Sequence, residues 1–266
     1  MMRCSAAVCA MVLSVAATAQ LPNGAPAAGY ISPTGVSEID RIADAYTNPP
    51  DDVKHLQTLL RDWAGLSYYT EANAKLAGTK VDVVFLGDSI THNWANPRFS
   101  TFMQGHGYVG RGIGGQVTSQ MVLRMPQDVL ALKPKVVVLL GGTNDLALMT
   151  PPDILRMIED NIAMMADLAT AHGERIILTS VMPVNDDHKK LTAIRPPDKI
   201  LALNAWMKQY AADHKLQYVD YYSALSDGKD RMKSDLSGDG LHPNVAGYKV
   251  IEPLIQKAIK KELKRQ

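Results

Sequence analysis

Three polar side chains have the types and spacing that nucleophilic catalysis requires. Ser89 follows the apolar run 83–86 and the pair Gly87-Asp88, which predicts a position at the carboxyl end of a buried strand. Asp239 and His242 lie three residues apart, so the carboxylate can bond one imidazole nitrogen while the other faces outward. If that nitrogen reaches the serine, it can remove the hydroxyl proton. Alone, the Asp-x-x-His spacing is more typical of a helix cap beside a surface histidine.

Two further residues could stabilise the charge that develops when a serine attacks a carbonyl. Gly115 offers a backbone N–H that no side chain obstructs, and Asn144 offers an amide donor. Together with the N–H of Ser89 they would form an oxyanion hole with three donors. Each is an ordinary turn residue by itself, so only the combination favours catalysis.

The elements that must position these residues follow from the hydrophobic pattern. Apolar runs alternate with segments of helical spacing, which predicts α/β architecture: a three-layer α/β/α sandwich around a parallel sheet of about five strands. Every polar cluster follows a strand, so we expect the clusters to gather at one edge of the sheet. The expected strands are 83–87, one around 108–109, 136–140, 175–181 and 218–221, and the main helices are 118–132 with a break at Pro126, 151–173, 197–214 and the segment after 244.

Four segments resemble the sequence blocks of the SGNH (GDSL) hydrolase superfamily, in the order of that family. The resemblance implies a flavodoxin-like SGNH hydrolase fold. The segments are Gly87-Asp88-Ser89-Ile90, Gly112-Ile113-Gly114-Gly115, Gly142-Thr143-Asn144-Asp145 and Asp239-Gly240-Leu241-His242-Pro243.

The same resemblance implies roles for particular residues. Ser89 would be the nucleophile of a catalytic triad with Asp239 and His242, and Ser89, Gly115 and Asn144 would form the oxyanion hole. The adjacent Gly114 is an alternative source of the glycine N–H. Gln116 stands where the family usually has an acidic residue.

Composition argues against several other functions. The net charge of +1 provides no field that would attract nucleic acid. Residues 110–115 fit the pattern G-x-G-x-x-G, but no later strand ends in an acidic residue at the distance that a dinucleotide site needs, so we expect no cofactor. Both cysteines, Cys4 and Cys9, lie in the presumed signal, and we expect no metal.

The first residues are typical of a secretory signal. Residues 1–19 combine a charged start, a short apolar stretch and a small-x-small ending at Ala19, and the apolar stretch is too short for a permanent membrane helix. We expect a flexible leader over 20–34, then a single hydrolase domain over 35–266, with N-terminal helices at 35–78 packed on it. The mature protein would be periplasmic or secreted, without stable membrane insertion.

The combined expectation is an exported serine esterase that forms an acyl-enzyme. Its first-choice substrate is a small-molecule or carbohydrate ester with a short acyl group such as acetyl. The alternatives are a lysophospholipase or thioesterase for longer acyl chains, and a catalytically silent carbohydrate-binding module. Trp94, Tyr68 and Tyr69 could line a substrate pocket or pack in the core. These patterns do not determine the oligomeric state.

Overall fold

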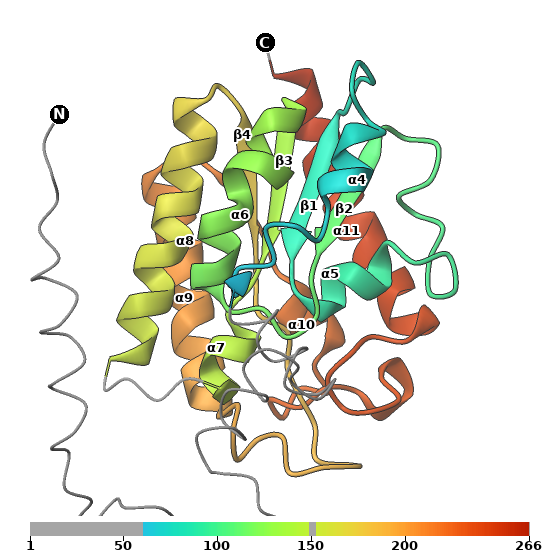
Figure 1. Ribbon diagram of the computed structural model, residues 1–266. Helices are drawn as coiled ribbons and strands as arrows, with labels where there is room; N and C mark the ends of the chain where they lie inside the picture. The colour runs from blue at the N-terminus through green and yellow to red at the C-terminus, as the bar shows by residue number, and fades with distance from the viewer. Residues whose placement is uncertain (1–60, 149–152, 266) are drawn as a thin grey trace, which may run out of the picture. The chain divides into compact units, whose positions relative to one another are not determined.

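The computed structural model describes residues 61–148 and 153–265 (Figure 1). The predicted signal peptide (1–19), the leader (20–34) and the part of the expected N-terminal helices before residue 61 lie outside the described residues. The prolines expected to open the helix at 151 lie outside them too. The described part of the expected N-terminal segment contains one short helix, α4 (Thr70–Ala74).

Five parallel strands form one sheet, in the order β2-β1-β3-β4-β5. The sheet has β1 between β2 and β3, so the chain leaves β1 first to one side and later continues on the other. Open α/β sheets bind ligands at such a point of reversal, beyond the carboxyl ends of the strands. The strands are β1 (Val83–Gly87), β2 (Tyr108–Gly112), β3 (Val136–Leu140), β4 (Arg175–Thr179) and β5 (Gln217–Val219).

Helices cover both faces of the sheet, which confirms the predicted three-layer sandwich (Figure 1). Alternate side chains of β1 point to opposite faces. Val84 and Leu86 join the core beneath α6 (Thr118–Asp128), α8 (Ile154–Ala171) and α9 (Pro197–Asp213). Val83 and Phe85 join the core beneath α5 (Ser89–Trp94), α10 (Tyr221–Leu225) and α11 (Val245–Lys264). The remaining short elements are η1 (Leu130–Leu132), α7 (Thr143–Leu148) and η2 (Ser234–Leu236).

Several predicted boundaries are wrong. The strand expected over 175–181 ends at Thr179, and the helix expected over 118–132 ends at Asp128 and is followed by η1. Tyr221 was expected in the last strand, yet it begins α10. The reason is a local cap: the Asp220 carboxylate accepts the N–H of Ser223 at 2.9 Å, which ends the strand at Val219. Pro126 was expected to interrupt its helix, but α6 continues through it to Asp128. Pro126 lies on the exposed side of α6, where water can satisfy the carbonyl that loses its partner.

Candidate active site

Ser89 lies in the first turn of α5, directly beyond the carboxyl end of β1. The carboxylate of Asp88 caps this helix by accepting the N–H of Ile90 at 2.9 Å. The turn is tight because β2 approaches it closely. A Cβ on Gly112 would lie only 2.2 Å from the backbone nitrogen of His92, so only glycine fits there.

His242 and Asp239 are placed to act on Ser89. The Nε2 atom of His242 lies 2.9 Å from Ser89 Oγ, and its Nδ1 atom lies 2.6 Å from Asp239 Oδ2. An ionised carboxylate can only accept, so Nδ1 carries the proton and Nε2 is free to accept from the serine hydroxyl. The three side chains that sequence analysis selected therefore form one connected chain of hydrogen bonds.

Asp239 is held in its charged form. Burial opposes its ionisation, but hydrogen bonds from the His242 ring and from the backbone N–H groups of His242 and Leu241 outweigh burial, and the pKa of Asp239 falls to about 2. Its Oδ1 atom accepts both backbone groups, at 2.8 and 2.9 Å. The carboxylate therefore stays ionised at neutral pH and fixes the orientation of the imidazole.

The two neighbouring glycines of the second sequence block, Gly114 and Gly115, lie beside Ser89. A Cβ on Gly114 would be 3.9 Å from Ser89 Cβ, and the peptide that follows Gly114 carries the N–H of Gly115. Gly115 has a φ of +76°, a left-handed conformation that favours glycine. Within residues 61–148 and 153–265, neither Gly115 nor Ser89 donates its backbone N–H to a protein acceptor. Both N–H groups can therefore donate to a substrate oxygen.

Asn144 is buried in the first turn of α7 and has a fixed orientation. Its Nδ2 atom donates one hydrogen to the backbone oxygen of Gln116 at 3.0 Å. Its Oδ1 atom faces Nη2 of Arg195 at 3.4 Å. Because Nδ2 has two hydrogens, one remains to donate to an oxyanion.

Arg195 is a site residue that sequence analysis missed. It comes from the loop between β4 and α9 (residues 180–196), which contains none of the four sequence blocks, and only 6% of it is exposed. Its Nε atom donates to Thr143 Oγ1 at 3.1 Å, beside Asn144. Burial lowers the pKa of Arg195, and the nearby charges of Asp88 and Asp239 act to raise it. An arginine in a polar loop is ordinary in sequence, so no signal marked it.

The same loop is joined to the segment that carries Asp239 and His242. The backbone N–H of Asn185 donates to Gly240 O at 2.9 Å, and its side chain donates to Met232 O at 3.0 Å. The loop therefore connects the region of Asn144 with the turn that carries Asp239 and His242.

Three other residues that could have belonged to the site are Asp145, Trp94 and Tyr68, and the first two serve to hold the fold together. Asp145 accepts the N–H and hydroxyl of Thr118, at 2.9 and 2.5 Å, so it joins α7 to α6. Trp94 is only 1% exposed and stacks on Tyr248, which makes it a core residue. Tyr68 is 53% exposed and is the most accessible of the three aromatic residues.

The described residues form neither a metal-binding cluster nor a membrane-spanning helix. Across 61–148 and 153–265, no three His, Cys, Asp or Glu side chains gather so that they could hold a metal ion. No helix in that part of the chain has the length and apolar character to cross a bilayer.

Comparison with known proteins found matches to a family model and to solved structures. A model of the GDSL-like lipase/acylhydrolase family matches residues 85–250, more than half of the chain. An acylhydrolase-like structure from Bacteroides fragilis is 40% identical, covers 76% of this chain and 99% of its own, and has a TM-score of 0.69. A GDSL-like lipase from Bacteroides thetaiotaomicron is 36% identical, with 75% and 99% coverage and a TM-score of 0.68.

One curated relative was matched over a shorter length. The uncharacterized lipoprotein YqeF of Bacillus subtilis is 30% identical over 125 residues, which are 41% of this chain and 51% of that protein. The chain therefore spans about half the length of this relative. With a family model that covers all four sequence blocks and two structures that share the fold at 36–40% identity, the chain belongs to the GDSL-like lipase/acylhydrolase family, a family of carboxylic ester hydrolases.

Proposed function

We propose that this protein is a serine esterase with a Ser89-His242-Asp239 triad. The observation that carries the proposal is the unbroken chain from Asp239 Oδ2 through the imidazole to Ser89 Oγ, with distances of 2.6 and 2.9 Å. This contact connects residues 153 positions apart in the sequence. A histidine that only caps a helix at the surface would not be expected to contact a serine at the carboxyl edge of the sheet.

The first half of the reaction acylates the serine. His242 Nε2 takes the proton of Ser89 Oγ as this oxygen attacks the ester carbonyl carbon, and the carbonyl oxygen becomes an oxyanion. The N–H groups of Ser89 and Gly115 and the remaining N–H of Asn144 bind it. The protonated imidazole, stabilised by Asp239, then gives its proton to the leaving alcohol, and the acyl group stays on Ser89.

The second half returns the enzyme to its starting state. His242 removes a proton from water, the resulting hydroxide attacks the acyl-enzyme, and the same donors bind the second oxyanion. Collapse releases the carboxylic acid, and His242 gives the proton back to Ser89 Oγ. Each step uses groups of this chain and water, so the cycle balances without a metal or organic cofactor.

For the substrate, we propose esters of short acyl groups, such as acetyl, on carbohydrate. The triad lies near the surface: the Asp239 side chain is 50% exposed and that of His242 is 28% exposed. An open site accommodates a large polar alcohol such as a sugar, whereas a long acyl chain needs an extended apolar channel. Tyr68, half exposed and 6.3 Å from the ring of His92 in the helix of Ser89, is available for stacking on a sugar.

For the location, we propose export, with removal of residues 1–19. The charged start, short apolar stretch and small-x-small ending support this proposal. The Bacillus subtilis relative is named a lipoprotein, which is also consistent with export. Mass spectrometry of the N-terminus of the mature protein tests it: an N-terminus at Gln20 supports it, and one that retains residues 1–19 contradicts it.

The activity is tested with p-nitrophenyl acetate and p-nitrophenyl octanoate, followed by acetate release from acetylated sugars. We expect turnover of acetate above octanoate, and a loss of about 10⁴-fold or more in kcat for Ser89→Ala. Preference for octanoate would favour the lysophospholipase or thioesterase alternative. Absence of turnover with both esters would favour a carbohydrate-binding module.

A further inference from the structure

Gln116 connects the proposed oxyanion donors to the rest of the protein. It follows Gly115 directly, and its backbone oxygen accepts the Asn144 Nδ2 hydrogen at 3.0 Å. Only 3% of Gln116 is exposed. The position of this residue therefore affects two of the three donors, one through the chain and one through a hydrogen bond.

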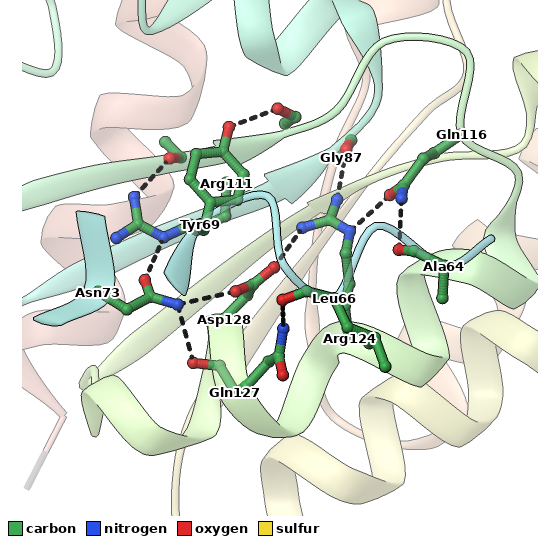
Figure 2. Close-up of polar contacts among 12 residues, drawn as sticks. Ala64, Leu66, Tyr69, Asn73, Gly87, Arg111, Gln116, Arg124, Gln127 and Asp128 are labelled. Carbon is green, nitrogen blue, oxygen red and sulfur yellow. Dashed lines mark hydrogen bonds and ion pairs between the residues drawn. The ribbon is translucent and has the colours of Figure 1, made fainter. Parts of the chain in front are cut away.

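The side chain of Gln116 is bonded at both ends (Figure 2). Its Oε1 atom accepts from Arg124 Nε at 2.5 Å, and its Nε2 atom donates to the backbone oxygen of Ala64 at 2.8 Å. A carboxylate at this place could accept from Arg124 but could not donate to Ala64. The amide thus satisfies two partners of opposite kind.

Arg124 connects Gln116 to the strand of the nucleophile. Its side chain is fully buried, and Nη2 donates to the oxygen of Gly87, two residues before Ser89, at 2.8 Å. Its Nη1 atom lies 3.3 Å from Asp128 Oδ2, which is also fully buried. The planar guanidinium therefore joins the end of β1, the segment of Gln116 and α6 in one rigid unit (Figure 2).

Residues 64–69, directly before α4, also pack against Gln116 and Gly112. Gly65 lies so close to Gln116 that an added Cβ would be 3.1 Å from Nε2. Tyr69 donates its hydroxyl to Gly112 O at 2.5 Å, at the start of the second sequence block. Residues 64–69 thus contact both ends of the segment 112–116: Tyr69 bonds Gly112, and Ala64 bonds the Nε2 atom of Gln116, while Arg124 bonds the Oε1 atom.

We propose that Gln116 and Arg124 are positioning residues that hold the Gly115 N–H and the Asn144 amide at a fixed place relative to Ser89. The inference rests on the proposed function. Oxyanion donors act through geometry set before the reaction begins, and small displacements reduce the rate strongly. The two residues touch no reacting atom; they fix the spacing between the end of β1 at Gly87, two residues before Ser89, and the segment that contains Gly115 and Gln116.

The test is Gln116→Glu, which keeps the size and the acceptor for Arg124 but places a carboxylate oxygen against Ala64 O. We expect kcat for p-nitrophenyl acetate to fall by about 10- to 100-fold, with KM within about twofold of the unmodified enzyme. A boronic acid that forms a tetrahedral adduct with Ser89 should lose affinity by a similar factor, because it needs the same donors. A purely structural role would change neither value in the folded variant.

Gln127→Leu is the matched control. Gln127 also donates to residues 64–69, through the oxygen of Leu66, but it lies on α6 and makes no described contact with Gln116. This variant should keep kcat within about twofold. Should Gln116→Glu fail to fold, Gln116→Met is the second variant: it removes both side-chain hydrogen bonds of Gln116, to Ala64 and from Arg124, without adding charge, and we expect the same loss of kcat.

The outcomes separate this inference from the function on which it rests. Unmodified protein without esterase activity would overturn both. Full activity in a folded Gln116 variant, or an equal loss of kcat in Gln127→Leu, would overturn the positioning role while the esterase activity stands.

Discussion

Removal of the Asn144 amide provides the sharpest test of the proposed oxyanion hole. The substitution Asn144→Ala deletes one of three donors and leaves the backbone glycine and the triad in place. Loss of one such donor raises the activation free energy by about 2.7–4 kcal/mol, which is a fall of about 10²–10³ in kcat. Because the bond strengthens as the carbonyl becomes an oxyanion, the loss belongs in kcat, and KM should change by less than about threefold.

The structure also predicts what this substitution does to stability. Asn144→Ala removes the donor to Gln116 O and the acceptor of Arg195 Nη2. Two lost hydrogen bonds cost about 2 kcal/mol together, so the Tm should drop by several degrees and no more. Kinetics at 25 °C then compare two folded proteins, and unfolding does not explain the change in kcat.

The assay measures kcat and KM with p-nitrophenyl acetate, next to Thr143→Val as control. Thr143 is the neighbour of Asn144, and its hydroxyl accepts from Arg195 Nε at 3.1 Å. The valine variant removes a bond to the same arginine without deleting an oxyanion donor, so kcat should fall by less than about tenfold. The reasoning is refuted if Asn144→Ala keeps kcat within threefold, or if a rise in KM accounts for the whole loss.

Two further predictions concern stability. Burial raises the pKa of Glu174 from 4.5 to about 7 in the folded protein, so folding is favoured below pH 4.5 and this advantage is lost as the pH rises through 7. The Tm should therefore fall between pH 5 and 8. In Glu174→Gln this titrating group is absent, so the free energy of unfolding should change with pH by at most about 3 kcal/mol less than in the unmodified protein. A pH profile of the Tm that is the same in both proteins would contradict the shift in pKa. Gly112→Ala should lower the free energy of unfolding, measured in urea, by about 1–3 kcal/mol or more, because its Cβ would lie 2.2 Å from His92 N. Gly238→Ala is the control: a Cβ there meets no atom within 4 Å, so the free energy of unfolding should change by less than about 0.5 kcal/mol. Equal midpoints for the two glycine variants would show that the close approach of β2 to α5 does not matter.

The sequence determined the features that depend on neighbours along the chain. Runs such as 136–140 are apolar throughout because both faces of a central parallel strand are covered, and that pattern predicted the five strands and the layers. The polar residues after each strand predicted which side chains meet, since the carboxyl ends of parallel strands share one edge. Together with the resemblance to the family's sequence blocks, this pattern selected Ser89, Gly115, Asn144, Asp239 and His242 as the candidate site residues.

Only the tertiary structure showed that two buried arginines, Arg195 and Arg124, bond to residues at the carboxyl edge of the sheet. Arg195 reaches Asn144 across 51 positions, and Arg124 reaches Gly87 across 37. In the sequence Arg124 lies on an amphipathic helix, where an arginine usually faces water, and Arg195 lies in a polar loop. A buried guanidinium needs specific acceptors, and those come from backbone oxygens and side chains of distant segments, so its position follows from packing rather than from any local pattern.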